Sequence, residues 1–245
     1  MMLKIKNENG EDLDAIIDGS ANATVIFVHG LGTDKYDGAN IFGDIAEMLS
    51  KRFRTVLFDL SGCGVSGGKE ENSNLLKWSR DLNSVIDFVK TTYGGDIIII
   101  AHSFGTFVTS KLSPNGIRIA VFLSMANIDT SGRSIKDRIR SRGGVVDENG
   151  ISTYPRTAGG VQKFGPEFWK ELERFEPVES IGTFAKKTKL TIIDPNQDEI
   201  VKDENRKGYS DIPNLKYVRM DGDHNFSKPV DRKALLDKVA GLLKQ

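Results

Sequence analysis

Continuous apolar, β-branched runs constrain the fold of this 245-residue chain more than any other feature. Strands buried on both faces of a parallel sheet have this pattern, whereas strands with one face in water alternate apolar and polar residues. The runs are Thr24–Val28, Thr55–Phe58, Ile97–Ile100, Ile119–Leu123, Leu190–Ile193 and Leu215–Val218. Helix-like sequence separates them, and a last helix is expected from Pro229 to Lys244. The alternation predicts an α/β fold with a mostly parallel, doubly wound sheet.

The N-terminal segment is predicted to be antiparallel. Asn9-Gly10 lies between the strand-like stretches Leu3–Lys6 and Leu13–Ile17. An Asn-Gly pair favours a two-residue hairpin turn because both residues adopt positive φ values there. We therefore expect a hairpin ahead of the parallel strands.

The alternation of strands and helices stops between residues 127 and 184. This stretch holds helix-like sequence at Arg133–Arg142, a hairpin candidate around Asn149-Gly150 and an aromatic helix at Pro166–Leu172. An insertion of this length with its own secondary structure is typical of a cap over the strand ends. We expect a core of residues 1–126 and 185–245, with residues 127–184 as the cap.

Composition excludes several classes of function. The 34 Lys and Arg residues balance 34 Asp and Glu residues, so the chain has no net charge to attract nucleic acid. One cysteine, Cys63, and three scattered histidines offer neither a disulfide nor a metal cluster. No apolar run is long enough to span a membrane, and the polar residues after Met1-Met2-Leu3 lead us to expect no signal peptide. We expect a cytoplasmic protein that acts on a small molecule and uses no cofactor.

The strongest functional signal is the strand that runs into Ser103, with Ala101 two residues before it and Gly105 two after. Small neighbours permit a sharp strand-to-helix turn, which would strain the serine backbone and expose its hydroxyl at a helix N-terminus. The segment resembles the nucleophile turn of the α/β-hydrolase family, with Ala101 in place of the usual first glycine. The resemblance implies an α/β-hydrolase fold with Ser103 as nucleophile. A chance serine in a strand-to-helix turn is the alternative.

A serine nucleophile needs a base within hydrogen-bond reach. His102 is adjacent to Ser103, so its side chain must point elsewhere, and His29 ends an early strand. His224 follows the last strand and precedes the final helix, where the α/β-hydrolase family places its base. By elimination and by position we expect His224 to be the base, against the alternative of a solvated loop histidine.

The base in turn needs a carboxylate that fixes its tautomer. Similar family members carry Gly-x-x-Asp followed by an apolar residue and Val after the strand that matches Leu190–Ile193. That pattern implies Asp198, with Pro195 in the glycine position. Asp194 at the strand end is the reserve candidate.

An oxyanion hole requires two N–H donors. The Phe104 N–H is one candidate because it follows Ser103. The segment His29-Gly30-Leu31 resembles the family's His-Gly-x loop, which implies the Leu31 N–H as the second donor and a structural role for His29. A plain glycine turn is the alternative.

A second glycine-rich segment matches the sequence pattern of a dinucleotide-binding loop but lacks the strand and helix context of one. Gly62 to Gly67 reads G-x-G-x-x-G, but loop-like sequence follows it, and Asp87 falls within a helix rather than at a strand end. The segment instead resembles the family's Asp-x-x-Gly-x-Gly-x-Ser loop, beginning at Asp59. Cys63 within it is expected to be a packed small residue.

The cap resembles the inserted subdomain of cinnamoyl and feruloyl esterases and related acyl-ester hydrolases. Phe164, Phe168 and Trp169 are candidates for an apolar wall around the substrate, and His102 is a further candidate contact. Packing of these rings between cap and core is an equal alternative. The basic residues of the cap could attract an anionic substrate or form a solvated helix face; they are Arg133, Lys136, Arg138, Arg140 and Arg142.

These features predict a carboxylic ester hydrolase that acts on short-chain acyl or hydroxycinnamoyl esters through Ser103, His224 and Asp198. A thioesterase, acylglycerol lipase, amidase or peptidase would use the same three residues, and a non-catalytic ligand-binding member of the fold is a more distant alternative. The sequence does not set the oligomeric state, and a homodimer remains open.

Overall fold

A computed structural model of the protein describes residues 1–156 and 160–244. Its centre is an eight-stranded sheet in the order β1-β2-β4-β3-β5-β6-β9-β10. Pairing is antiparallel from β1 to β4 and parallel from β4 through β10. The strands are β1 (Met2–Lys6), β2 (Asp12–Asp18), β3 (Thr24–Val28), β4 (Arg54–Phe58), β5 (Ile97–His102), β6 (Ile117–Leu123), β9 (Lys189–Pro195) and β10 (Leu215–Met220). The predicted α/β fold with a mostly parallel sheet is confirmed.

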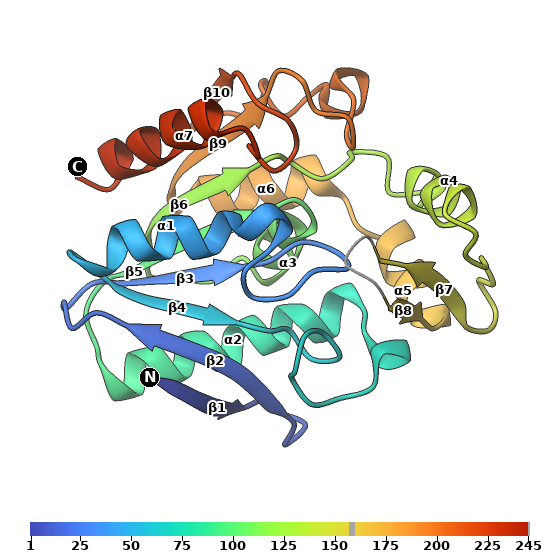
Figure 1. The fold of residues 1–245 in the computed structure, drawn as a ribbon, viewed down its shortest axis with the longest axis horizontal. Coiled ribbons are helices and arrows are strands. Elements are labelled where there is room, and N and C mark those ends of the chain that lie inside the picture. Colours follow the sequence, from blue (N-terminus) through green and yellow to red (C-terminus); the bar gives the residue numbers. More distant parts are fainter. Residues whose placement is uncertain (157–159, 245) are drawn as a thin grey trace.

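Helices cover both faces of the sheet (Figure 1). One face packs against α1 (Ile41–Ser50) and α7 (Pro229–Leu242). The other packs against α2 (Leu75–Thr92), α3 (Phe104–Leu112) and α6 (Pro177–Ala185). No helix in the described part of the chain is both long and apolar enough to cross a membrane.

The run Ile97–Ile100 shows why the central strands are apolar throughout. Ile97 and Ile99 belong to the apolar cluster on the α2 and α3 side, whereas Ile98 and Ile100 belong to the cluster on the α1 and α7 side. All four are at most 1% exposed. Each buried isoleucine stabilises the fold by about 2 kcal/mol, so both faces of β5 anchor the segment that leads into Ser103.

The N-terminal hairpin is present, but its turn is longer than predicted. Strands β1 and β2 pair from Met2↔Ile16 to Lys6↔Asp12, which leaves residues 7–11 in the loop. Gly10 has a positive φ of 73°. The Asn7 carboxamide oxygen accepts hydrogen bonds from the Asn9 and Glu11 N–H groups. The side chain of Asn7 thus closes a wider loop in place of the two-residue turn.

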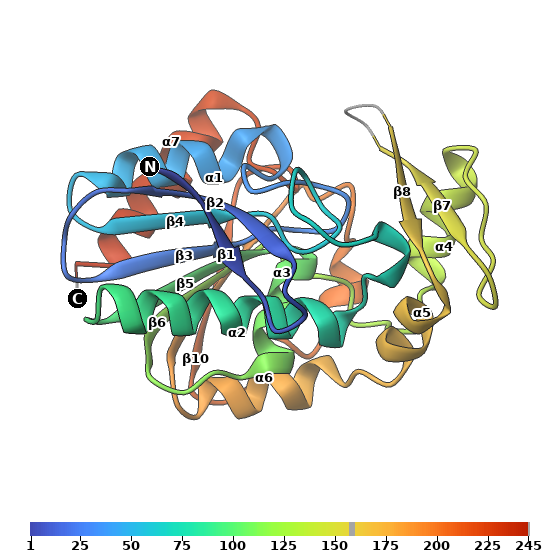
Figure 2. The same ribbon diagram turned by 90° about the horizontal axis from the view of Figure 1, so that it is seen from below.

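Between β6 and β9 the chain forms α4 (Arg133–Ser141), β7 (Ser152–Pro155), β8 (Val161–Phe164) and α5 (Pro166–Glu173) before it reaches α6. These four elements lie beyond the C-terminal ends of the parallel strands (Figure 2). Helix α6 differs, because Phe184 stacks on Phe122 of β6 with ring centres 5.9 Å apart. The segment predicted as cap therefore includes one helix that covers the sheet.

The predicted hairpin around Asn149-Gly150 is present only as a single antiparallel bridge. Only one bridge, Val145↔Thr153, spans that turn, whereas β7 pairs with β8 in antiparallel register from Ser152↔Phe164 to Pro155↔Val161. The Asp147 carboxylate accepts from the Asn149 and Gly150 N–H groups, which curls the loop tightly. Residues 157–159, between β7 and β8, lie outside the described residues.

Candidate active site

Ser103 occupies a strained turn between β5 and α3. Its φ of 50° and ψ of −122° lie outside the regions that non-glycine residues ordinarily adopt. A Cβ at Gly105 would lie 2.1 Å from the Val28 carbonyl oxygen, so only glycine permits this approach of α3 to β3. The backbone geometry at Ser103 therefore agrees with the sharp turn predicted from the sequence.

His224 and Asp198 are brought together from loops that follow adjacent strands. His224 Nδ1 lies 2.7 Å from Asp198 Oδ2. The other oxygen, Oδ1, accepts from the Ile200 and Val201 N–H groups at 2.7 and 2.8 Å. The buried Arg206 guanidinium also binds Oδ2. Four donors thus fix the orientation of the Asp198 carboxylate.

These contacts set the charge of the carboxylate. Burial alone would raise the pKa of Asp198, but the hydrogen bond and charge of His224, the charge of Arg206 and the Val201 N–H outweigh it and hold the pKa well below its usual range. Asp198 is therefore ionised near neutral pH.

Asp194, the reserve candidate, is occupied elsewhere. Its Oδ1 accepts from the Met125 N–H at 2.7 Å and its Oδ2 from the Tyr217 hydroxyl at 2.7 Å. It is fully buried at the end of β9. The structure therefore places Asp198, and not Asp194, against the His224 ring.

Sequence analysis missed Asp37, which forms a buried pair with His102. His102 Nδ1 lies 2.9 Å from Asp37 Oδ2, and its Nε2 lies 3.0 Å from the His224 carbonyl oxygen. Both partners are acceptors, so both ring nitrogens carry protons. Nothing in the local pattern of the loop that holds Asp37 indicates this partner 65 residues away.

The contact between Asp37 and His102 shifts the pKa values of both residues and contributes to the shifted pKa of His224. Although burial opposes each charge, the charge and hydrogen bond of Asp37 raise the pKa of His102, and those of His102 lower the pKa of Asp37 to about 2. Burial lowers the pKa of His224, the charges of His102 and Arg138 add to this, and Asp198 only partly offsets them. His224 is therefore neutral near pH 7, the state required of a general base.

The two predicted oxyanion donors lie beside Ser103. The Phe104 N–H begins α3, and neither it nor the Leu31 N–H has a hydrogen-bond acceptor among residues 1–156 and 160–244. Gly30 allows the loop to approach, since a Cβ there would lie 3.2 Å from the Ser103 Cβ. The Gly30 N–H is held by Asp37 Oδ2 at 2.9 Å. Predicted as structural, His29 accepts from the Leu60 N–H at 3.1 Å through its buried ring.

Ser103 lines two cavities. The larger, of about 410 Å³, also contains His102, His224 and Tyr154. The smaller, of about 50 Å³, contains Phe104 and a mostly apolar set of side chains. Leu31, Ser103, Arg138 and Ile200 line both.

The predicted aromatic wall is not in either cavity. Phe164, Phe168 and Trp169 are at most 5% exposed and line neither space. Phe168 stacks on Phe164 and Phe104 at ring-centre distances of 4.3 and 5.8 Å, and its edge meets Trp78 of α2. These rings pack β8 and α5 against α2 and α3, where burial of their large apolar area stabilises the contact. Tyr154 of β7 faces the larger cavity instead.

The segment from Gly62 to Gly67 is a loop that does not open a helix, as we predicted when we rejected a dinucleotide-binding site there. It precedes α2, which begins at Leu75, and Asp87 lies within that helix. Buried Asp59 accepts from the Val65 N–H and from Lys35. Cys63 is 2% exposed, and burial raises the pKa of its thiol to about 12, so it is a packed residue.

The mostly parallel eight-stranded sheet, with a strained serine turn between β5 and α3, is typical of the α/β-hydrolase class. A model of the "Alpha/beta hydrolase family" matches residues 25–228, and the chain belongs to that family. No curated protein matches the sequence significantly.

Solved structures share the fold at low sequence identity. Est1E from Butyrivibrio proteoclasticus, solved with ferulic acid bound, has a TM-score of 0.75 at 18% identity, with 99% of this chain and 100% of that chain covered. The Pyrococcus furiosus esterase Pf2001 has a TM-score of 0.70 at 20% identity, with 100% and 91% covered. The α/β hydrolase GrgF from Penicillium sp. sh18 has a TM-score of 0.79 at 14% identity, with 100% and 97% covered.

Proposed function

We propose that this protein is a serine hydrolase that cleaves carboxylic esters. The observation that carries the proposal is the strained Ser103 turn, in one cavity with a neutral His224 whose Nδ1 is bonded to Asp198. The esterase neighbours support ester substrates, and the ferulic acid bound to Est1E supports aryl acyl groups as one substrate type to test.

The reaction proceeds through an acyl-enzyme. Ser103 Oγ bonds to the ester carbonyl carbon while His224 Nε2 takes the hydroxyl proton, and Asp198 stabilises the imidazolium. The Leu31 and Phe104 N–H groups stabilise the oxyanion. When the carbon–oxygen bond breaks, His224 returns the proton to the leaving alcohol. Water then attacks with His224 again as base, which releases the carboxylic acid and restores Ser103.

We propose that α4 through α5 act as the cap and that α6 belongs to the core. The cap contributes Arg138, Arg142, Tyr154 and Arg156 to the larger cavity, while Ser103 and His224 come from the core. The cap thus shapes the space into which substrate enters, and the core supplies the chemistry.

A substrate panel tests the ester assignment. We expect p-nitrophenyl acetate and butyrate to be hydrolysed with kcat/KM at least about 100-fold above the acetanilide analogue, because an amide offers a poorer leaving group. An acetyl thioester and a hydroxycinnamate methyl ester complete the panel. A preference for the thioester or the anilide would replace the ester proposal with a thioesterase or amidase.

A further inference from the structure

Ser103 lies at the junction of two cavities that differ in chemistry. The smaller is lined by the apolar residues Phe107, Leu172 and Val201, and exposed Asp129 is also among its lining residues. At about 50 Å³ it holds an acyl group of about four heavy atoms. The larger is about eight times as roomy and is lined in part by guanidinium groups.

The position of His224 orients an ester across this junction. His224 lines the larger cavity and not the smaller one. In serine hydrolysis the histidine must reach the leaving oxygen to protonate it. The leaving alcohol therefore belongs in the larger cavity, and the acyl group belongs in the smaller one beside Phe104.

Positive charge exceeds negative charge in the larger cavity. Arg138, Arg142 and Arg156 line it together with Asp34 and Asp37. Asp37 is committed to His102. Arg156 pairs with Glu70 at 2.8 Å, so its charge is already balanced. Arg142 lies with its guanidinium carbon 5.5 Å from the centre of the Tyr154 ring.

Arg138 lines both cavities, and its charge is not balanced by a carboxylate among the described residues. Its Nη2 donates to the Ile200 carbonyl oxygen at 3.3 Å, which holds it beside the loop that carries Asp198. No carboxylate lies within ion-pair distance of it in the described ranges, 1–156 and 160–244. Its charge also reaches the reacting groups, since it contributes, after burial and His102, to the lowered pKa of His224.

We infer that this site takes short-acyl esters of an alcohol that carries an anionic oxygen group, a carboxylate or a phosphate, bound by Arg138. The inference rests on the proposed ester hydrolase function. A guanidinium offers paired N–H donors that match both groups, and partial burial strengthens such a pair. The opposite arrangement is less favourable, because the smaller cavity is lined by one arginine and one aspartate, whereas the larger is lined by three arginines and two aspartates.

Matched leaving groups test the inference. The substrates are 4-acetoxybenzoate, 4-acetoxyphenyl phosphate and neutral methyl 4-acetoxybenzoate, which share the acetyl group. For each variant we take the ratio of kcat/KM for an anionic ester to kcat/KM for the neutral ester. A loss of catalysis that affects both esters equally does not change this ratio. Comparison of the two anionic esters distinguishes carboxylate from phosphate recognition.

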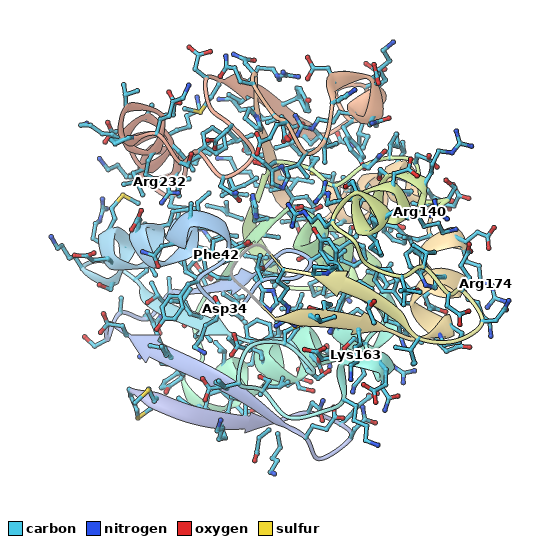
Figure 3. All side chains as sticks on the ribbon, turned by 45° about the vertical axis from the view of Figure 1, so that its right-hand side comes forward. Asp34, Phe42, Arg140, Lys163, Arg174 and Arg232 are labelled. Atoms are coloured by element: carbon cyan, nitrogen blue, oxygen red, sulfur yellow. The ribbon has the colours of Figure 1, made fainter. Side chains whose placement is uncertain are left out.

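Arg138→Gln is expected to lower that ratio about tenfold or more for at least one anionic ester. Arg138→Lys should retain most of it because the charge remains. Arg140→Gln is the matched control, since Arg140 lies on the same helix (Figure 3). Arg140 pairs with exposed Asp137 and lines neither cavity. In the wild type, raising salt from 0.05 to 0.5 M should lower the ratio, a readout that does not depend on any variant folding.

Two failures are distinguishable. If the wild type cleaves the neutral ester but a folded Arg138→Gln variant changes neither ratio by more than about twofold, or salt lowers neither ratio in the wild type, the inference is overturned while the ester hydrolase proposal stands. If the wild type cleaves none of the three esters, the proposed function fails and the inference fails with it.

Discussion

His102 Nε2 donates a hydrogen bond to the backbone carbonyl of His224, with 3.0 Å between nitrogen and oxygen. The Ser124 hydroxyl donates to the same carbonyl at 2.7 Å. The last residue of β5 and the first residue after β6 thus hold the loop that carries the proposed base. Because Asp37 keeps His102 protonated, the contact also places a positive charge beside the His224 ring, whose centre is 4.9 Å away.

The first prediction concerns the pH dependence of activity. His102→Gln keeps a donor toward the His224 carbonyl but removes the charge that lowers the pKa of His224. The pKa of His224 should therefore rise, and the acid limb of the kcat/KM profile for p-nitrophenyl acetate should move to higher pH. At pH 6 the variant should lose several-fold more activity than at pH 8. A limb that stays in place or moves to lower pH would refute the electrostatic role of His102.

The second prediction concerns stability. The pKa of Asp37 is lowered to about 2, so its stabilising contribution is present above the unfolded value near 4 and disappears as the pH falls toward 2. Asp37→Asn should reduce the free energy of unfolding by about 2 kcal/mol at pH 6 and by much less at pH 2. Urea unfolding at both pH values measures this. Asp96→Asn, at an exposed pair with Arg118, is the control and should show no comparable difference.

The third prediction separates the two aspartates. Asp198→Asn removes the carboxylate that orients His224 and should lower kcat about 10³- to 10⁴-fold with the fold retained. Asp194→Asn disturbs the Met125 and Tyr217 contacts, so we expect a loss of about 1–3 kcal/mol in stability but at most about a tenfold loss of kcat. Steady-state kinetics with circular dichroism decides between them, and the reverse order of kcat effects would assign Asp194.

The fourth prediction treats the cap aromatics as packing residues. Phe168→Ala should destabilise the protein by about 3–5 kcal/mol because it empties a site stacked between Phe164 and Phe104. The order of preference across acetyl, butyryl and hexanoyl esters should stay the same. Val161→Ala, at an exposed position of β8, serves as control. If Phe168→Ala changed the order of preference among the three esters but not the stability, Phe168 would be a substrate contact and not a packing residue.

The features predicted correctly from sequence are those with local physical causes. The isoleucines of β5 identify a strand buried on both faces, and the strand ends place Ser103 and His224 near one edge of the sheet. The Asp37 contact with His102 joins the loop after β3 to the end of β5, 65 residues further along the chain, and no periodicity encodes it. Strand β8 escaped notice because it is short and mixes apolar with polar residues. Arg138 and Arg140 look alike in sequence, and only tertiary packing brings Arg138 to the cavities.

Covalent labelling of Ser103 tests its proposed role as the nucleophile. The protein is treated with a fluorophosphonate probe, and the modified peptide is identified by mass spectrometry while p-nitrophenyl acetate hydrolysis is followed. The account predicts one adduct, on Ser103, with activity lost in proportion to labelling. Ser103→Ala should be folded, unlabelled and inactive, whereas Ser84→Ala, on α2 outside both cavities, should match the wild type. Undiminished hydrolysis by Ser103→Ala, or a wild type that stays unlabelled, would contradict the account.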